Sequence, residues 1–181
     1  MSKFTNKDLA IMALFTALCY LGTLINFPIV VGGMKTMIHF GNIFCLVGAI
    51  ILGGKKGGIS ASIGMGLFDI FNGWILYAPS TFILKFFIAY ITATVYEKLS
   101  STKGQKRVII SFSVGMLFNV IFSPIIIYLL GYFIVGISTE AASIFVAYES
   151  IVTLINAVIA VISATLIYNI LVKTSLIKNR Q

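Results

Sequence analysis

Six apolar runs fill most of this 181-residue chain, and they limit what it can fold into. A helix needs about 20 apolar residues to cross the hydrocarbon core of a bilayer. The runs cover residues 9–27, 41–52, 57–71, 82–96, 108–135 and 145–172. They predict an all-α membrane protein, a six-helix transmembrane bundle that forms one domain over residues 1–181.

The second and third runs are short for this interpretation. About 13 residues at 1.5 Å each reach roughly 20 Å, against a hydrocarbon core of roughly 30 Å. These two helices therefore extend into the flanking loops, tilt, or do not cross the whole bilayer.

Composition supports a membrane protein without a soluble domain. Hydrophobic residues make up 59% of the chain and charged residues 10%, whereas soluble domains carry about 25% charged residues. The net charge of +8 lies in short clusters between apolar runs, so it does not indicate a nucleic-acid partner. Cys19 and Cys45 lie inside apolar runs and are expected to be free, packed thiols. No cleavage site follows the first run, so a signal peptide is not expected.

The positions of the basic residues predict the orientation. The chain contains thirteen Lys and Arg. With six spans and a cytoplasmic N-terminus, eleven of them fall on the cytoplasmic side and two, Lys35 and Lys85, on the outer side. Cytoplasmic segments are enriched in Lys and Arg. The pattern predicts that both termini are cytoplasmic.

Polar and ionisable residues gather toward the outer half of the predicted helices. Such groups are expensive in hydrocarbon, by a few kcal/mol on insertion scales, and commonly mark a functional site. Helical spacing places Tyr77, Thr81 and Lys85 on one face. In the fifth run Ser111, Gly115, Asn119 and Ser123 share a face, and in the sixth run Glu149, Thr153 and Asn156 do so. We expect a site for a small polar solute formed by His39, Asn42, Asp69, Asn72, Trp74, Tyr77, Thr81, Lys85, Asn119, Glu149 and Asn156.

Plainer interpretations of these residues stay open. Asp69 or Glu149 could form a structural ion pair with Lys85, and amides could bond between helices for about 0.6 kcal/mol each. Trp74 and Tyr77 could belong to an interfacial aromatic belt or stack on a planar ligand.

Three further segments carry structural expectations. The apolar connection 26–38 is expected to be a loop that folds over the site, and Gly53 to Gly58 a tight basic turn. Pro124 is expected to interrupt the fifth helix. Ala13 and Ala17 form a small-residue strip, suited either to packing inside the bundle or to docking on a partner.

No enzyme or metal site is expected. The single histidine disfavours a His-based metal site, and no cofactor is indicated. Neither H-E-x-x-H nor G-x-S-x-G occurs. A G-x-x-x-x-G-K-[ST] nucleotide loop is also missing, so any use of ATP has to come from a partner.

The chain resembles the substrate-binding S components of energy-coupling factor (ECF) transporters, of the riboflavin-type superfamily. The resemblance covers most of the chain and is densest over 39–87. It rests on the strip Ala13-x-x-x-Ala17, His39-Phe40-Gly41-Asn42, the Gly-rich segment 52–58, Gly64-x-Gly66-x-x-Asp69, and segment 78–86. The stretch 39–87 is most similar to members assigned to pyridoxine-like or hydroxymethylpyrimidine-like substrates.

The resemblance implies a vitamin-binding subunit in a bacterial cell membrane. Ala13 and Ala17 would dock on a transmembrane T component driven by two ATPases, and the first outer loop would be the gate. The solute would be a small planar vitamin, related to vitamin B6 or hydroxymethylpyrimidine, with riboflavin as a further option. Two alternatives are a self-sufficient carrier or channel and a ligand-free assembly protein. Carriers often contain internal repeats, and no convincing repeat is present.

Overall fold

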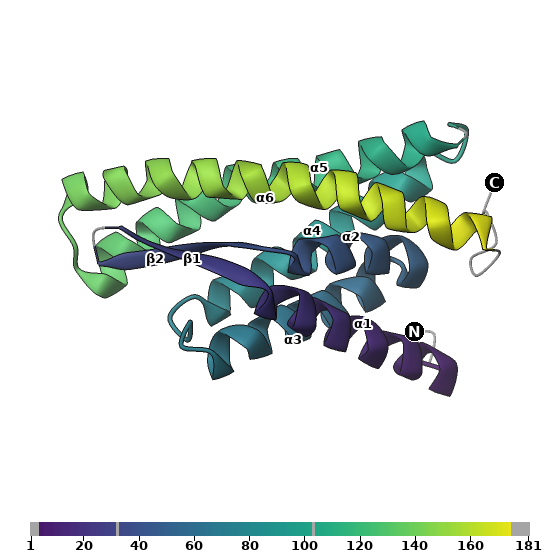
Figure 1. Ribbon diagram of the computed structural model, residues 1–181, viewed down its shortest axis with the longest axis horizontal. Helices are drawn as coiled ribbons and strands as arrows, with labels where there is room; N and C mark the ends of the chain where they lie inside the picture. Colours follow the sequence, from purple (N-terminus) through teal and green to yellow (C-terminus); the bar gives the residue numbers. More distant parts are fainter. Residues whose placement is uncertain (1–3, 32, 103, 175–181) are drawn as a thin grey trace.

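The structure is a computed structural model that describes residues 4–31, 33–102 and 104–174. Within them, six α-helices and one hairpin lie roughly along a common axis, as Figure 1 shows. The elements are α1 (Asn6–Leu24), β1 (Asn26–Val31), β2 (Met34–His39), α2 (Gly41–Leu52), α3 (Gly54–Phe71), α4 (Ala78–Lys98), α5 (Gln105–Leu130), the π-helical turn η1 (Gly131–Val135) and α6 (Thr139–Lys173). Each predicted apolar run thus contributes a helix.

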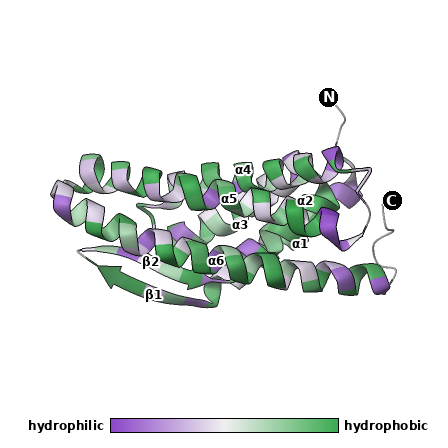
Figure 2. Ribbon diagram, turned by 90° about the horizontal axis from the view of Figure 1, so that it is seen from above, coloured by the Kyte–Doolittle hydropathy of each residue, from purple (hydrophilic) through white to green (hydrophobic). Residues whose placement is uncertain are grey.

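Four helices are long and apolar enough to cross a membrane: α1, α4, α5 with η1, and α6. By contrast, α2 has only 12 residues, and the six-span count and the orientation stay predictions. Figure 2 shows hydrophobic residues along much of each helix. The 35 residues of α6 make it roughly 52 Å long, which exceeds a hydrocarbon core of roughly 30 Å. This helix therefore tilts or projects beyond the core.

The connection 26–38 is an antiparallel β-hairpin, so the expected loop and the all-α class are wrong for this segment. Its strands pair from Asn26 with His39 to Val31 with Met34. Both strands are rich in β-branched and long apolar residues, which suit a pleated, half-buried surface. Gly33, at φ 81°, supplies a positive φ between them.

A single residue, Gly53, separates α2 from α3. Lys55 and Lys56 belong to the first turns of α3, so the predicted basic turn is wrong. Gly53 has φ 80°, which a residue with a side chain rarely adopts. Gly57 then allows close packing, because a Cβ on it would lie 2.8 Å from the Cα of Ala49 in α2.

Small residues let α3 pack closely against α1 and α4. A Cβ on Gly64 would lie 2.3 Å from the carbonyl oxygen of Thr16 in α1, and one on Gly66 would lie 2.5 Å from the ring of Phe82 in α4. The hydroxyl of Ser62 donates to the carbonyl of Phe82 at 2.7 Å. Close backbone approach of this kind drives helix association in membranes.

The fifth helix continues through Pro124, so the predicted interruption there is wrong. Pro124 lies inside α5, which runs on to Leu130. A proline removes one intrahelical hydrogen bond, but helices in membranes tolerate this when neighbouring groups satisfy the freed carbonyl. The continuous helix carries Asn119 and Ser123 on its buried side.

Contacts between helices also hold the end of the bundle that carries both termini (Figure 1). Lys56 in α3 forms an ion pair with Asp8 at 2.6 Å, and Thr5 and Asp8 form a capping box at the start of α1. Arg107 lies 3.8 Å from the ring centroid of Tyr96. Packing and pairing therefore hold this end together, and a polar cavity of about 90 Å³ lies toward the opposite end.

Candidate functional site

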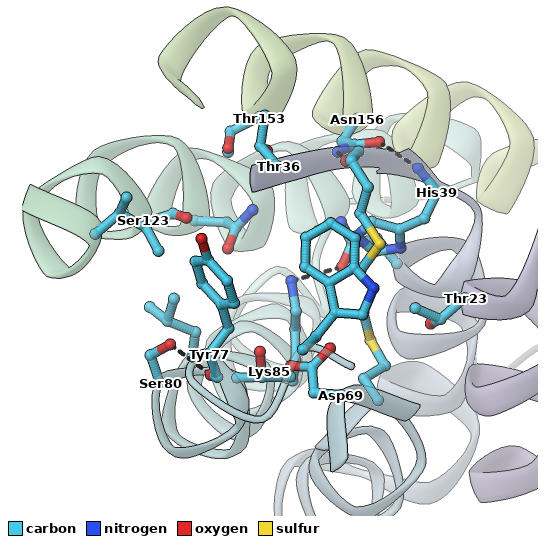
Figure 3. A pocket seen from close by; sticks show the side chains of 18 of the residues that line it. Thr23, Thr36, His39, Asp69, Tyr77, Ser80, Lys85, Ser123, Thr153 and Asn156 are labelled. Carbon is cyan, nitrogen blue, oxygen red and sulfur yellow. Dashed lines mark hydrogen bonds between the residues drawn. The ribbon is translucent and has the colours of Figure 1, made fainter. Parts of the chain in front are cut away.

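A polar cavity of about 90 Å³ lies where the hairpin meets the helix ends farthest from the termini. Its walls come from β2, the ends of α2, α3 and α4 nearest the hairpin, and the facing stretches of α5 and α6. In Figure 3, Asp69 and Lys85 lie on one side of the cavity and Thr36, Thr153 and Asn156 on the other. Segments far apart in the chain therefore converge on one space.

The structure brings ten of the eleven predicted site residues to this cavity. They are His39, Asn42, Asp69, Trp74, Tyr77, Thr81, Lys85, Asn119, Glu149 and Asn156. Asn72 is the exception: it is exposed, and its amide donates to the Phe68 carbonyl at 3.0 Å and the Tyr20 hydroxyl at 3.3 Å. It caps the end of α3 and does not line the cavity, so the structure does not bring it together with the other ten.

Several lining residues were not in the predicted set, among them Lys35, Thr36, Ser123 and Thr153. Ser123 follows Asn119 by one helical turn, and Thr153 follows Glu149 in the same way. Helical spacing already placed both on the predicted polar faces, although the predicted site did not include them. Lys35 and Thr36 lie on β2. They could have been placed at the cavity only if the segment had been predicted as a strand.

Side chains satisfy the edge of β2 that faces away from β1. The backbone N–H of Lys35 donates to the hydroxyl of Tyr77 at 3.0 Å. The amide of Asn156 accepts from the N–H of His39 at 3.0 Å and donates to the carbonyl of Met37 at 2.9 Å. Asn156 thus takes the place of a peptide group on a third strand.

The pairing also explains why a proline is tolerated in this hairpin. Pro28 lies opposite Met37, whose carbonyl points toward Asn156 and away from β1. At such a pair the backbone groups of both strands point outward. The missing N–H of Pro28 therefore costs no bond between the strands.

Glu149 ties the hairpin to two helices. Its carboxylate accepts hydrogen bonds from the hydroxyls of Thr36 in β2, Ser123 in α5 and Thr153 in α6, the last two at 2.9 Å each. Both carboxylate oxygens are used. Lys85 forms no ion pair with Asp69 or Glu149, the two pairs considered above. Within the described residues, the ion pair shorter than 4 Å joins Lys56 and Asp8.

Lys85 orients Asn42. Its buried ammonium donates to Oδ1 of Asn42 at 3.1 Å. Because an ammonium cannot accept a hydrogen bond, this contact determines which end of the Asn42 amide faces Lys85. The Nδ2 group of Asn42 is left as a donor.

His39 lies buried at the end of β2, next to this pair. Its Nδ1 accepts from the N–H of Gly41 at 3.2 Å. Burial, together with the positive charge of Lys85, lowers the pKa of His39 to about 3. The ring is therefore neutral at physiological pH, with its proton on Nε2.

Three buried polar atoms at the cavity have no hydrogen-bond partner among the described residues. They are Nδ2 of Asn42, Oδ2 of Asp69 and Oδ1 of Asn119, on residues that are 1%, 2% and 3% exposed. Buried polar groups in native proteins are nearly always paired. A fourth such atom, Oγ1 of Thr92, belongs to a residue outside the cavity. The three at the cavity are available to a bound solute.

Two aromatic rings complete the wall. Trp74 and Tyr77 are buried, with ring centroids 5.7 Å apart and planes tilted by 56°. The ammonium of Lys35 lies 4.5 Å from the centroid of Trp74 and donates to the carbonyl of Gly73. Burial raises the pKa of Tyr77 above its ordinary value of 10.0, so its hydroxyl stays protonated. Both side chains line the cavity, and their stacking on a ligand stays a prediction.

Two other sequence-based expectations can be compared with the structure. Cys19 and Cys45 are free and buried, as predicted. Ala13 and Ala17 both lie on the exposed face of α1, so they do not pack inside the bundle. Over the described parts of the chain, no group of three His, Cys, Asp or Glu residues could hold a metal ion.

Comparison with known proteins agrees with this architecture. The family model described as "ECF-type riboflavin transporter, S component" matches residues 3–173, nearly the whole chain. No curated protein and no solved structure matches the chain. The chain therefore belongs to the family of ECF-type riboflavin transporter S components.

Proposed function

We propose that this chain is the high-affinity substrate-binding subunit of an ECF-type vitamin importer. Its solute is a small planar water-soluble vitamin, related to vitamin B6 or to hydroxymethylpyrimidine, with riboflavin as a third candidate. The unpaired atoms of Asn42, Asp69 and Asn119 around one cavity carry this proposal. Leaving such a group unpaired costs about 1–3 kcal/mol, and a solute that pairs them recovers that cost.

The cavity is proposed to face the outside of the cell. It lies at the end of the bundle opposite both termini, and the charge pattern predicts that the termini are cytoplasmic. The hairpin covers the cavity, so it is the gate through which the solute enters.

The partners proposed are a transmembrane T component and two ATPases in a bacterial cell membrane. The sequence contains no Walker loop, so the energy for import comes from the ATPases. Ala13 and Ala17 lie on the exposed face of α1, where small side chains let a partner helix approach closely. This face of α1 is the proposed docking surface.

Tryptophan fluorescence tests solute binding. Trp74 is the single tryptophan and lies in the cavity wall, so any change in emission reports on the site. The purified chain in detergent would be titrated with pyridoxine, pyridoxamine, hydroxymethylpyrimidine, thiamine and riboflavin. A saturable change at nanomolar concentration of one compound supports the proposal, whereas a flat response to all five contradicts it.

Uptake into proteoliposomes distinguishes the importer from a self-sufficient carrier. Vesicles containing the chain alone would be compared with vesicles that also contain a T component and two ATPases, with ATP. Uptake that requires the partners and ATP supports the proposal. Equal uptake by the chain alone would make it a carrier.

A further inference from the structure

We infer that the cavity selects an uncharged single-ring solute through Asn42, Asp69 and Asn119, while Glu149 and Asn156 hold the hairpin and do not contact the solute. This inference rests on the proposed function, because it names the class of solute for the same cavity. It divides the polar lining residues into two groups by whether their hydrogen bonds are already used.

Asn42 and Asp69 define two of the groups that the solute has to present. Lys85 holds Oδ1 of Asn42, so Nδ2 is a donor that requires an acceptor on the solute. Oδ2 of Asp69 has no partner in the described chain and requires a donor. A nitrogen heterocycle provides both groups. Its ring nitrogen, or an oxygen attached to the ring, is the acceptor for Asn42, and a hydroxyl or amine substituent is the donor for Asp69.

Asn119 provides the third contact. Its Oδ1 has no partner within the described residues, and its amide offers both a donor and an acceptor. Its Oδ1 therefore pairs with a further hydroxyl or amine that donates to it. Because Asn42, Asp69 and Asn119 come from α2, α3 and α5, they contact a solute from different sides.

Glu149 and Asn156 are occupied in a different way. Three hydroxyls already donate to the carboxylate of Glu149. Both ends of the Asn156 amide bond the backbone of β2. A solute could bond either residue only by displacing the hairpin or a hydroxyl that fastens it.

The charges around the cavity favour an uncharged solute. The lining residues include two cations, Lys35 and Lys85, and two carboxylates, Asp69 and Glu149. The Lys85 ammonium bonds Asn42, and the Lys35 ammonium bonds Gly73. Phosphate sites use clustered donors and positive charge, and no such cluster is present among the lining residues described. We therefore expect phosphorylated forms of a vitamin not to bind.

The volume favours one ring. An apolar cavity of about 150 Å³ holds benzene, and this cavity has a volume of about 90 Å³. With the hairpin in place, even a single substituted ring has to displace lining side chains in order to fit. The three fused rings of riboflavin would require the hairpin to move away.

A matched pair of variants tests the division of residues without any solute. Asn119→Leu removes an unpaired buried amide, so the melting temperature of the solute-free protein in detergent is expected to rise. Asn156→Leu leaves two backbone groups of β2 unpaired, so the melting temperature is expected to fall. A fall of equal size for both variants would overturn the assignment.

Binding measurements test the solute class. Trp74 fluorescence of the wild-type chain would be titrated with pyridoxine, hydroxymethylpyrimidine, pyridoxine 5′-phosphate and riboflavin. Binding of a single-ring, unphosphorylated compound is expected, and Asp69→Asn is expected to weaken it about 10- to 100-fold. Glu140→Gln, the same kind of change at an exposed position of α6, serves as the control and is expected to have no effect.

A test of selectivity separates contact from positioning. The tightest single-ring compound would be compared with analogues that each lack one hydroxyl or amine. In Asp69→Asn, the compound is expected to lose its higher affinity relative to one of the analogues. In Asn156→Leu, the affinities for the compound and for all analogues are expected to fall by the same factor. Loss of a preference in Asn156→Leu would overturn its role as a positioning residue.

The remaining outcomes distinguish this inference from the proposed function. Tight binding of riboflavin and not of the single-ring compounds would overturn the solute class and leave the vitamin-binding function intact. Tight binding of pyridoxine 5′-phosphate would overturn the charge argument in the same way. No response to any vitamin would overturn both.

Discussion

Asn156 offers the sharpest test of how the hairpin is held over the cavity. Its side chain makes two hydrogen bonds to β2, with the N–H of His39 at 3.0 Å and the carbonyl of Met37 at 2.9 Å. Leucine has a similar size and cannot make either bond. Asn156→Leu therefore removes the attachment of β2 to α6 at this point and leaves the bonds between β1 and β2 unchanged.

The expected effect follows from the two bonds lost. An unpaired buried backbone group costs about 1–3 kcal/mol, while hydrogen bonds between membrane helices average about 0.6 kcal/mol. Taking both into account, the free energy of local opening of the hairpin should fall by about 1–3 kcal/mol, which raises the opening equilibrium constant about 5- to 150-fold.

Hydrogen–deuterium exchange measures this opening directly. Mass spectrometry of a peptide that covers 34–39 would be recorded for the solute-free protein in detergent. Asn169→Leu is the control, because Asn169 is a half-buried asparagine in the same helix, in the part near the C-terminus. Unchanged exchange over 34–39 in Asn156→Leu, relative to wild type, would refute the idea that Asn156 anchors the hairpin.

Three further changes have defined outcomes. Gly64→Ala should lower the free energy of unfolding by about 1–3 kcal/mol. Gly66→Ala should lower it less, because the Cβ added at 66 meets the ring of Phe82, whereas the one added at 64 meets the backbone of Thr16. Equal melting temperatures for the two variants would contradict this. Ala17→Leu should leave vitamin binding intact but reduce ATP-dependent uptake in the reconstituted importer; full uptake would exclude this face as the docking surface. The pKa of His39 is lowered from 6.5 to about 3, so its stabilising contribution is present above pH 6.5 and is lost as the pH falls toward 3. The melting temperature should thus fall between pH 7 and pH 5 in wild type and less in His39→Asn; parallel profiles would contradict it.

The two groups of lining residues indicate how binding and closure are related. The hairpin is fastened by residues of α6 and of the turn before α4, and the unpaired atoms lie on α2, α3 and α5. Under the proposed function, a solute that bonds the second group would lie beneath the hairpin, and the anchors would hold the hairpin over it.

Helix positions and most of the site could be predicted from the order of residues alone. The run 41–52 matches α2 residue for residue, because a bilayer accepts few structures other than helices along an apolar run. Polar residues within such runs are costly, so they mark the interior. That reasoning placed Asp69, Lys85 and Asn119 correctly around the cavity.

The hairpin and the roles of the acidic and amide residues could not be predicted in this way. A short apolar segment such as 26–38 suits a loop or a strand, and pairing with β1 and with Asn156 made it a strand. Glu149 and Asp69 are both acids on predicted polar faces. Three hydroxyls satisfy Glu149, one of them from Thr36, 113 residues away, while an oxygen of Asp69 stays unpaired in the described structure. Local spacing determines which face a residue occupies, but its hydrogen-bond partners come from distant segments, and their positions depend on how the helices pack.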